Sequence, residues 1–210
     1  MRVTIFIEGG GDRDDLRTEC RKGFRQFFER AGLKGRMPKP IACGARDAAF
    51  DRFRTALSIA KSGEFAILLV DSEDPVAIDP ATKNHVSPWI HLTSQARWTK
   101  PATATDDQAH LMVQCMETWF LADPDSLKTY FGPGFKADKI KTHPKLEDVG
   151  KSTVFKELAE ATATVKTKSK YDDRSKGTHS FEILAKLDPA KVREACPHAD
   201  RLLKTLEAKL

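Results

Sequence analysis

The fold is decided by the first strand and turn of the chain, Val3-Thr4-Ile5-Phe6-Ile7-Glu8-Gly9-Gly10-Gly11-Asp12-Arg13-Asp14-Asp15. Five apolar or β-branched residues lead directly into an acid, three glycines and a charged segment. This order predicts a buried strand, a tight corner and then a helix. The corner would hold Glu8 at the carboxyl end of the strand.

The pattern of strand and helix repeats after this corner. Apolar residues at three- and four-residue spacing predict a helix over 14–31, and a weaker strand is expected around 40–43. Asp47 is placed to cap a second helix that ends near Ser62 and Gly63, and a third strand over 65–70 ends at Asp71. The β-α-β-α-β order with nearly continuous apolar strands predicts an α/β fold, with a mostly parallel sheet covered by helices on both faces.

The rest of the chain is less regular. We expect a lid or short added elements over 75–105, a fourth strand over 110–116, and short helices over 153–163, 180–187, 189–195 and 199–210. Residues 166–179 form a basic loop in this interpretation. A boundary near Gly132 would separate a core, residues 1–131, from a basic helical C-terminal extension, residues 132–210, unless both belong to one continuous domain.

Composition narrows the class of protein. The chain has 210 residues, 40% hydrophobic and 31% charged, which is typical of a globular domain and of neither a disordered nor a membrane protein. Without a leader-like or membrane-spanning segment, we expect a cytoplasmic protein. The four cysteines have no paired spacing, which favours buried reduced thiols over a zinc site or disulfides.

Charge is unevenly distributed along the chain. Residues 1–131 contain 18 basic and 18 acidic side chains, whereas residues 132–210 contain 17 basic and 12 acidic ones, so the last part carries the whole net charge of +5. This distribution suits a metal site beside a surface that binds a polyanion.

Acidic side chains follow the predicted strands at the edge where α/β sheets bind ligands. Glu8 follows the first strand, Asp71, Glu73 and Asp74 follow the third, and Glu117 follows the fourth. Such carboxylates suit a hard divalent cation, although a solvated acidic turn and a helix-capping role for Glu117 are the simpler alternatives. The glycines lack the lysine and spacing of a nucleotide-binding loop, so they serve either to let a metal and phosphate approach or only to form the corner.

A family resemblance is carried by Ile7-Glu8-Gly9, by Val70-Asp71-Ser72-Glu73-Asp74 and by Gln114-Cys115-Met116-Glu117-Thr118-Trp119-Phe120-Leu121-Ala122-Asp123. These residues resemble an uncharacterised bacterial family of small TOPRIM-related proteins, which is similar to the nuclease domain of overcoming-lysogenization-defect enzymes. TOPRIM domains have a glutamate after the first strand and an Asp-x-Asp after the third. Glu73 stands here in place of the second aspartate, with Asp74 beside it.

The resemblance implies a TOPRIM-like fold, Mg²⁺ or Mn²⁺ as cofactor, and cleavage of phosphodiester bonds. Glu8, Asp71, Glu73, Asp74 and Glu117 would be the metal ligands, and a lysine would neutralise the negative charge of the transition state. Lys176 is the first choice for that lysine and Lys170 the second, although a solvated loop is the simpler interpretation. The expected partners are DNA or RNA, a partner ATPase in phage defence, and in one interpretation a second copy of the chain.

Four basic residues are expected to contact nucleic acid: Arg13, Lys170, Arg174 and Lys176. The tryptophans are a further option, because Trp89 and Trp98 would stack on unpaired bases if exposed, whereas Trp119 is expected in the core. Two other functions stay open at this point. One is a non-catalytic module that binds nucleic acid or protein, and the other is a phosphohydrolase or nucleotidyl transferase acting on small molecules.

Overall fold

The centre of the protein is a four-stranded sheet whose strands are all parallel. The computed structural model describes residues 1–172 and 176–210, without the side chains of Lys176 and Thr178. The strands are β1 (Arg2–Ile7), β2 (Lys39–Ala42), β3 (Glu64–Asp71) and β4 (Ala109–Met112), in the spatial order β2-β1-β3-β4. The predicted α/β class with a parallel sheet is therefore confirmed.

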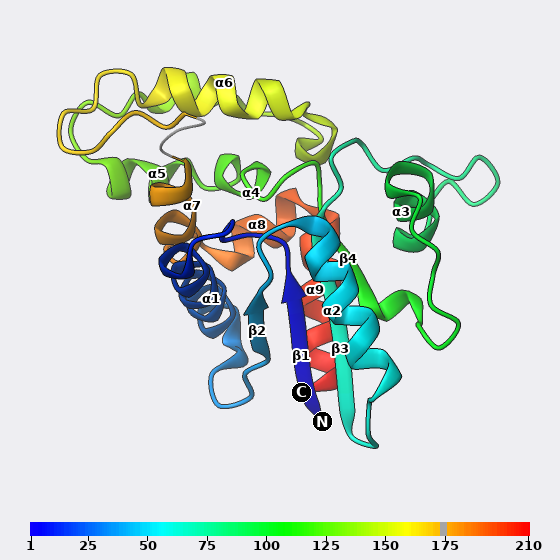
Figure 1. Cartoon of the computed structure of the whole chain (residues 1–210). Helices are drawn as coiled ribbons and strands as arrows, with labels where there is room; N and C mark the ends of the chain where they lie inside the picture. The colour runs from blue at the N-terminus through cyan, green and yellow to red at the C-terminus, as the bar shows by residue number, and fades with distance from the viewer. Residues whose placement is uncertain (173–175) are drawn as a thin grey trace.

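Helices and short turns connect and surround the strands. They are α1 (Asp14–Phe28), η1 (Glu29–Leu33), α2 (Arg46–Ser58), α3 (Pro88–Ala96), η2 (Asp106–Gln108), α4 (Thr118–Leu121), α5 (Pro124–Phe131), η3 (Ala137–Lys139), η4 (Leu146–Asp148), α6 (Lys151–Ala161), α7 (Lys176–Leu184), α8 (Pro189–Ala195) and α9 (Pro197–Lys209). Figure 1 shows that α4 to α7 gather beyond the ends towards which the strand arrows point.

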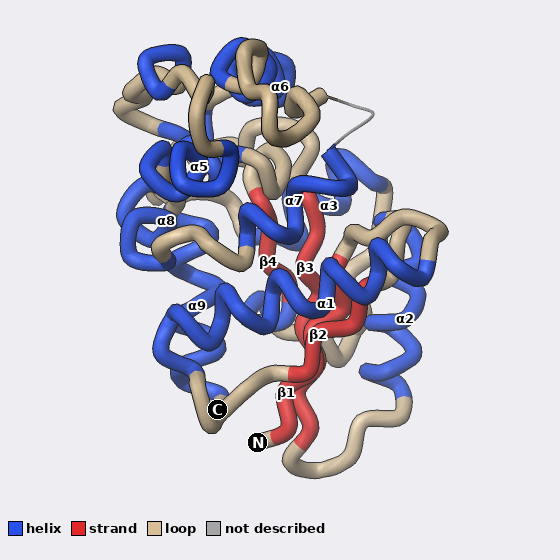
Figure 2. The backbone as a smooth tube through the Cα atoms, turned by 90° about the vertical axis from the view of Figure 1, so that its left-hand side faces the viewer, coloured by secondary structure: helices blue, strands red, loops and turns tan. Residues whose placement is uncertain are grey.

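Each face of the sheet is covered by its own apolar layer, because side chains alternate along a strand. Ile5 and Ile7 of β1 belong to the larger core, which includes residues of α1 and α9, whereas Phe6 belongs to the core that includes residues of α2 and α3. Figure 2, turned by 90°, shows α2 and α9 on opposite sides of the sheet. The two faces thus have helical covers, as the apolar strands predict.

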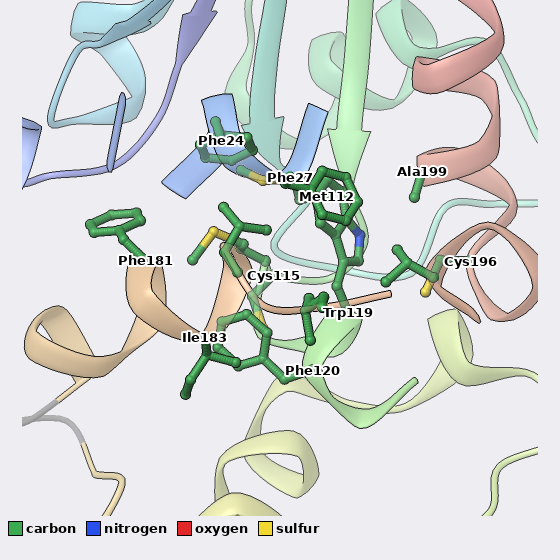
Figure 3. Close-up of a cluster of buried hydrophobic side chains, with 14 of the residues drawn as sticks. Phe24, Phe27, Met112, Cys115, Trp119, Phe120, Phe181, Ile183, Cys196 and Ala199 are labelled. Carbon is green, nitrogen blue, oxygen red and sulfur yellow. The ribbon is translucent and has the colours of Figure 1, made fainter. Parts of the chain in front are cut away.

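The larger core extends from the sheet into the C-terminal part. Trp119 of α4 is fully buried and stacks on Phe27 of α1, with ring centroids 5.5 Å apart (Figure 3). Phe181 and Ile183 of α7 and Cys196 lie in the same cluster. Residues from both sides of position 131 therefore share one hydrophobic core.

Several predicted boundaries were wrong. The fourth strand ends at Met112 and not at residue 116, because the chain turns after it and the backbone N–H of Met116 donates to the Asp71 carboxylate. Asp47 does not cap α2, which begins at Arg46; its carboxylate accepts a hydrogen bond from the Trp98 indole. The predicted 153–163, 180–187 and 199–210 helices begin two to four residues too late.

Other expectations have clear outcomes. All four cysteines are buried and free, as predicted. The irregular 75–105 segment contains the added helix α3, also as predicted. Trp89 and Trp98 are buried, so the expectation that their rings stack on unpaired bases was wrong. No helix in the described ranges combines the length and the apolar character needed to cross a bilayer.

Candidate functional site

The corner after β1 holds Glu8 at the carboxyl edge of the sheet. The Glu8 backbone N–H donates to the carbonyl of Leu69 at 2.9 Å, so the residue continues the pairing of β1 with β3. One residue later, Gly9 and Gly44 exchange two hydrogen bonds of 2.9 Å, which join the corner to the segment after β2. Glu8 is therefore fixed from both neighbouring strands.

The glycines of this corner permit close approach of the backbone. Gly10 has a φ of +83°, and a Cβ there would lie 2.7 Å from the Cα of Arg17. At Gly44, with a φ of +77°, a Cβ would lie 2.5 Å from the carbonyl oxygen of Gly11. Only glycine combines these conformations with such contacts. The corner thus needs its glycines for packing, whatever else binds there.

Three carboxylates from this corner and the end of β3 come together. Oxygen atoms of Glu8, Asp71 and Glu73 all lie within 4.8 Å of one another. Each of the first two is held by one backbone group: the N–H of Asp71 donates to Glu8 Oε2 at 3.0 Å, and the N–H of Met116 donates to Asp71 Oδ1 at 2.9 Å. Asp74 is exposed and lies outside this carboxylate cluster. Of the two acids considered for the third position, Glu73 is the one in place.

Burial and mutual repulsion make these acids hard to ionise together. Desolvation is the main cause that raises the pKa of Glu8 to about 6, against the attraction of Arg46 and Lys151. Desolvation also raises the pKa of Asp71 well above its usual range, and the charges of Glu8, Glu117 and Glu73 add to the effect. A bound cation would relieve this repulsion.

The lysine that faces the cluster is Lys151, the first residue of α6. Its Nζ lies 2.7 Å from Glu73 Oε2 and 3.9 Å from Asp71 Oδ2. The sequence prediction missed it, because an isolated lysine after Gly150 looks like any helix start. Arg46 is a second missed cation: its Nε and Nη2 are buried and donate no hydrogen bond to any described residue, and its charge acts on Glu8.

Glu117 is buried beside the cluster and is held by hydroxyl groups. It immediately precedes α4, but its side chain makes no capping hydrogen bond. Its Oε1 instead accepts from the Tyr171 hydroxyl at 3.0 Å and from the Ser180 hydroxyl at 3.2 Å. Glu117 is not among the three carboxylates within 4.8 Å of each other. The alternative role of Glu117 as a helix cap is therefore not observed. Its carboxylate instead lies close enough for its charge to act on Asp71.

Four of these charged groups line a cavity of about 400 Å³, and Glu73 and Arg46 are not among its lining residues. Its acidic and basic lining comes from Glu8, Asp71, Glu117 and Lys151, and the glycine corner forms part of the wall. Apolar side chains of Leu16, Met112, Met116, Phe155 and Phe181 also line it, together with Gly177 and Ser180 of α7. A cavity of this size admits a phosphate group with part of the molecule attached to it.

The predicted nucleic-acid contacts are only partly located. Arg13 is exposed, and its side chain pairs with the carboxylate of Asp15. Lys170 is exposed. Arg174 and the side chain of Lys176 lie outside the described residues, although the backbone of Lys176 begins α7 and the adjacent Gly177 lines the cavity.

Comparison with known proteins gives a family but no activity. The model of a domain of unknown function, DUF4276, matches residues 7–207. No curated protein and no solved structure matches the chain.

Proposed function

This chain belongs to the DUF4276 family, and we propose that it is a divalent-metal-dependent nuclease of the TOPRIM type that works in the cytoplasm. The observation that carries the proposal is the cluster of Glu8, Asp71 and Glu73 at the carboxyl edge of a parallel sheet, with ligand atoms within 4.8 Å of one another. The position agrees with the general rule that α/β sheets bind ligands outside the carboxyl ends of their strands.

The donor set fits Mg²⁺ or Mn²⁺. Every side chain in the cluster offers carboxylate oxygen, which these hard cations prefer over nitrogen or sulfur. Glu8 and Asp71 each use one oxygen for a backbone N–H, and these bonds fix the orientation of both carboxylates. Glu8, Asp71 and Glu73 would therefore hold the ion, while Asp74 would stay in solvent.

In phosphodiester cleavage, the bound ion would polarise a phosphoryl oxygen and lower the pKa of an attacking water. Lys151 would stabilise the negative charge that develops on the phosphate, the role considered for Lys176 from the sequence. Its ammonium pairs with Glu73 in this structure, so this ion pair would open when Glu73 holds the ion, and the ammonium would then be free to contact the phosphate. Glu117, held by Tyr171 and Ser180, would orient the water or accept its proton.

Nucleic acid, either DNA or RNA, is the proposed polyanionic substrate. Its support is the excess of basic residues in 132–210, the part that supplies Lys151 and the cavity residues of α7. Action together with a partner ATPase in phage defence remains a proposal from the family resemblance. A homodimer likewise remains a proposal.

One observation favours a second candidate, a phosphohydrolase or nucleotidyl transferase of small molecules. The cavity is concave and about 400 Å³ in volume, and five of its fifteen lining residues have apolar side chains, which suits a small ligand. A small phosphate ester would enter it completely, whereas a polynucleotide would insert one phosphate and leave the rest on the surface.

The test is cleavage by purified protein with Mg²⁺ or Mn²⁺, alone and with a candidate partner ATPase. Labelled single- and double-stranded DNA and RNA would be compared with a panel of nucleotides and phosphate esters. We expect polynucleotide cleavage that is lost in Glu8→Gln and Glu73→Gln. Asp74→Asn is the matched control, because it removes the adjacent acid outside the cluster.

Three outcomes contradict the nuclease proposal in different ways. Turnover of small esters alone would favour the second candidate. Salt-sensitive nucleic-acid binding without turnover, unchanged by Glu8→Gln, would favour a non-catalytic binding module. If Mn²⁺ soaked into crystals gives no anomalous density between Glu8, Asp71 and Glu73, the metal site itself is wrong.

A further inference from the structure

A second group of metal-ligating side chains lies apart from the carboxylate cluster. It consists of His85, Glu147 and His198, whose ligand atoms all lie within 4.8 Å of one another. His85 is in the segment between β3 and α3, Glu147 is in η4, and His198 is in the first turn of α9. Three distant parts of the chain therefore place two imidazoles and one carboxylate at one point.

Glu147 and His198 form a preorganised pair. Both side chains are buried. Glu147 Oε1 accepts from the backbone N–H of His198 at 2.9 Å, and its Oε2 lies 2.7 Å from Nδ1 of the same residue. The first bond caps the start of α9 and the second fixes the plane of the imidazole. Adjacent ligands on a tetrahedral ion with bonds of about 2.1 Å lie about 3.4 Å apart, so Nδ1 and Oε2 would move apart by less than about 1 Å to take the ion.

His85 supplies the third donor from the segment between β3 and α3. Its ring stacks on His198, with centroids 4.7 Å apart and planes 12° apart. It is carried by a small hairpin in which Ile78 pairs with His85, and Val86 N–H donates to the Ala77 carbonyl at 2.9 Å. Nearly parallel rings do not direct their nitrogens at one point, so the His85 ring would turn to bind an ion. No described residue hydrogen-bonds to this ring, so the turn breaks no hydrogen bond among the described residues.

We propose that His85, Glu147 and His198 bind a divalent transition-metal ion of the Zn²⁺ type. Imidazole nitrogen suits such ions, whereas Mg²⁺ prefers an all-oxygen set such as the carboxylate cluster. Zn²⁺ would take the place of the proton between His198 Nδ1 and Glu147, and binding would release that proton to solvent. The inference does not depend on the proposed nuclease function.

The site would have three protein ligands and an open position. A cavity of about 450 Å³ adjoins His85 and His198, with room for a water or another small ligand on the ion. Arg201 also lines this cavity, but its guanidinium is engaged by the carbonyls of Ala109 and Asp106, at 2.9 and 2.6 Å. The ion would fasten the hairpin over 77–86 to α9 and η4.

The test is Zn²⁺ binding by the full-length protein, measured by competition with a chromophoric chelator. Excess Mg²⁺ would be present to occupy the carboxylate cluster. We expect one tightly bound Zn²⁺, and at least a 10-fold loss of affinity in His85→Ala, a change at an exposed position that should leave the fold intact. Glu8→Gln should still bind Zn²⁺, which separates this site from the proposed nuclease centre.

A matched control is available within the chain. His143 also pairs with a buried carboxylate, since its Nε2 lies 2.9 Å from Glu157 Oε1, but this pair belongs to no group of three ligands among the described residues. His143→Ala should leave Zn²⁺ affinity unchanged. Hydrogen exchange over 77–86 should slow on adding Zn²⁺ to the wild type but not to His85→Ala. Equal Zn²⁺ affinity in the wild type and His85→Ala, or a zinc anomalous peak elsewhere, would overturn the assignment.

Discussion

Asp71 and Asp123 are the same residue type in contrasting surroundings. Asp123 accepts hydrogen bonds from the backbone of Ser126 and of Asp188, and its Oδ1 lies 2.8 Å from Lys191 Nζ. These donors lower the pKa of Asp123 although burial opposes them. Asp71 has one backbone donor and a lysine at 3.9 Å. Burial first, and the charges of three other carboxylates second, raise its pKa.

The difference separates an acid used for folding from one suited to binding. Asp123 caps α5 and joins it to the start of α8, so its charge is compensated within the chain. Among the described residues, Lys151 and Arg46 compensate the charge around Asp71, and two cations are too few for Glu8, Asp71, Glu73 and Glu117 together. A folded protein that keeps such a cluster gains stability when a cation binds.

Asp71→Asn should have the largest effect on function of the changes considered. Loss of a central ligand should reduce metal-dependent cleavage by about 1000-fold or more, while the fold persists because the amide oxygen can still accept from Met116. Rates at saturating Mn²⁺, with thermal unfolding of the metal-free protein, provide the measurement. Near-normal cleavage by Asp71→Asn would show that the cluster is not the reaction centre.

Lys151→Gln should give the next largest effect. It removes the charge proposed to stabilise the transition state, so we expect kcat to fall by about 100-fold with a smaller change in metal affinity. Lys156→Gln, an exposed change on the same helix, is the control and should retain the wild-type rate. If both variants have equal rates, Lys151 only compensates the acids in the metal-free state.

Asp123→Asn should have the opposite profile. The buried carboxylate is held by several donors, so its neutralisation should lower the free energy of unfolding by about 2 to 3 kcal/mol. Cleavage per folded molecule should stay unchanged, because Asp123 lies outside the cavity lining. Urea denaturation and active-site titration measure the two quantities. A large loss of activity without loss of stability would remove the distinction between the two aspartates.

The sequence was sufficient for the sheet and for most of the carboxylate cluster. Buried parallel strands are nearly continuous apolar runs, so β1 and β3 were recognised, and a strand that ends in an acid places that acid at the ligand edge. Glu8 and Asp71 were found in this way. The end of β4 was misplaced because apolar character continues into a turn, whose direction depends on a hydrogen bond to Asp71.

The rest depends on contacts between distant segments. Lys151 reaches Glu73 across 78 residues, and no local pattern marks that lysine. His85 and His198 are far apart in sequence and match no zinc motif, yet the fold brings their rings into contact. Tyr171 and Ser180 likewise meet Glu117 only through packing of the C-terminal part. Sequence spacing predicts sites within one element better than sites assembled from three.

The smallest expected effect is a pH dependence of folding stability that differs between Glu8 and Asp123. The pKa of Glu8 is raised from 4.5 to about 6, so the folded state binds this proton more tightly than the unfolded state. Metal-free stability should therefore fall by roughly 1 to 2 kcal/mol as pH rises from 4.5 through 6, and then level off. Asp123, with a lowered pKa, should lose its contribution to stability only at more acidic pH, as pH falls through and below 3.8.

Urea denaturation in EDTA at pH 4.5 to 7.5 measures the pH dependence of stability, with Glu8→Gln as the comparison because it lacks the titrating group. Adding Mg²⁺ at pH 7.5 should restore stability in the wild type and not in Glu8→Gln. If the difference in stability between the wild type and Glu8→Gln is constant with pH, Glu8 is ionised in the folded state without penalty, as Asp123 is.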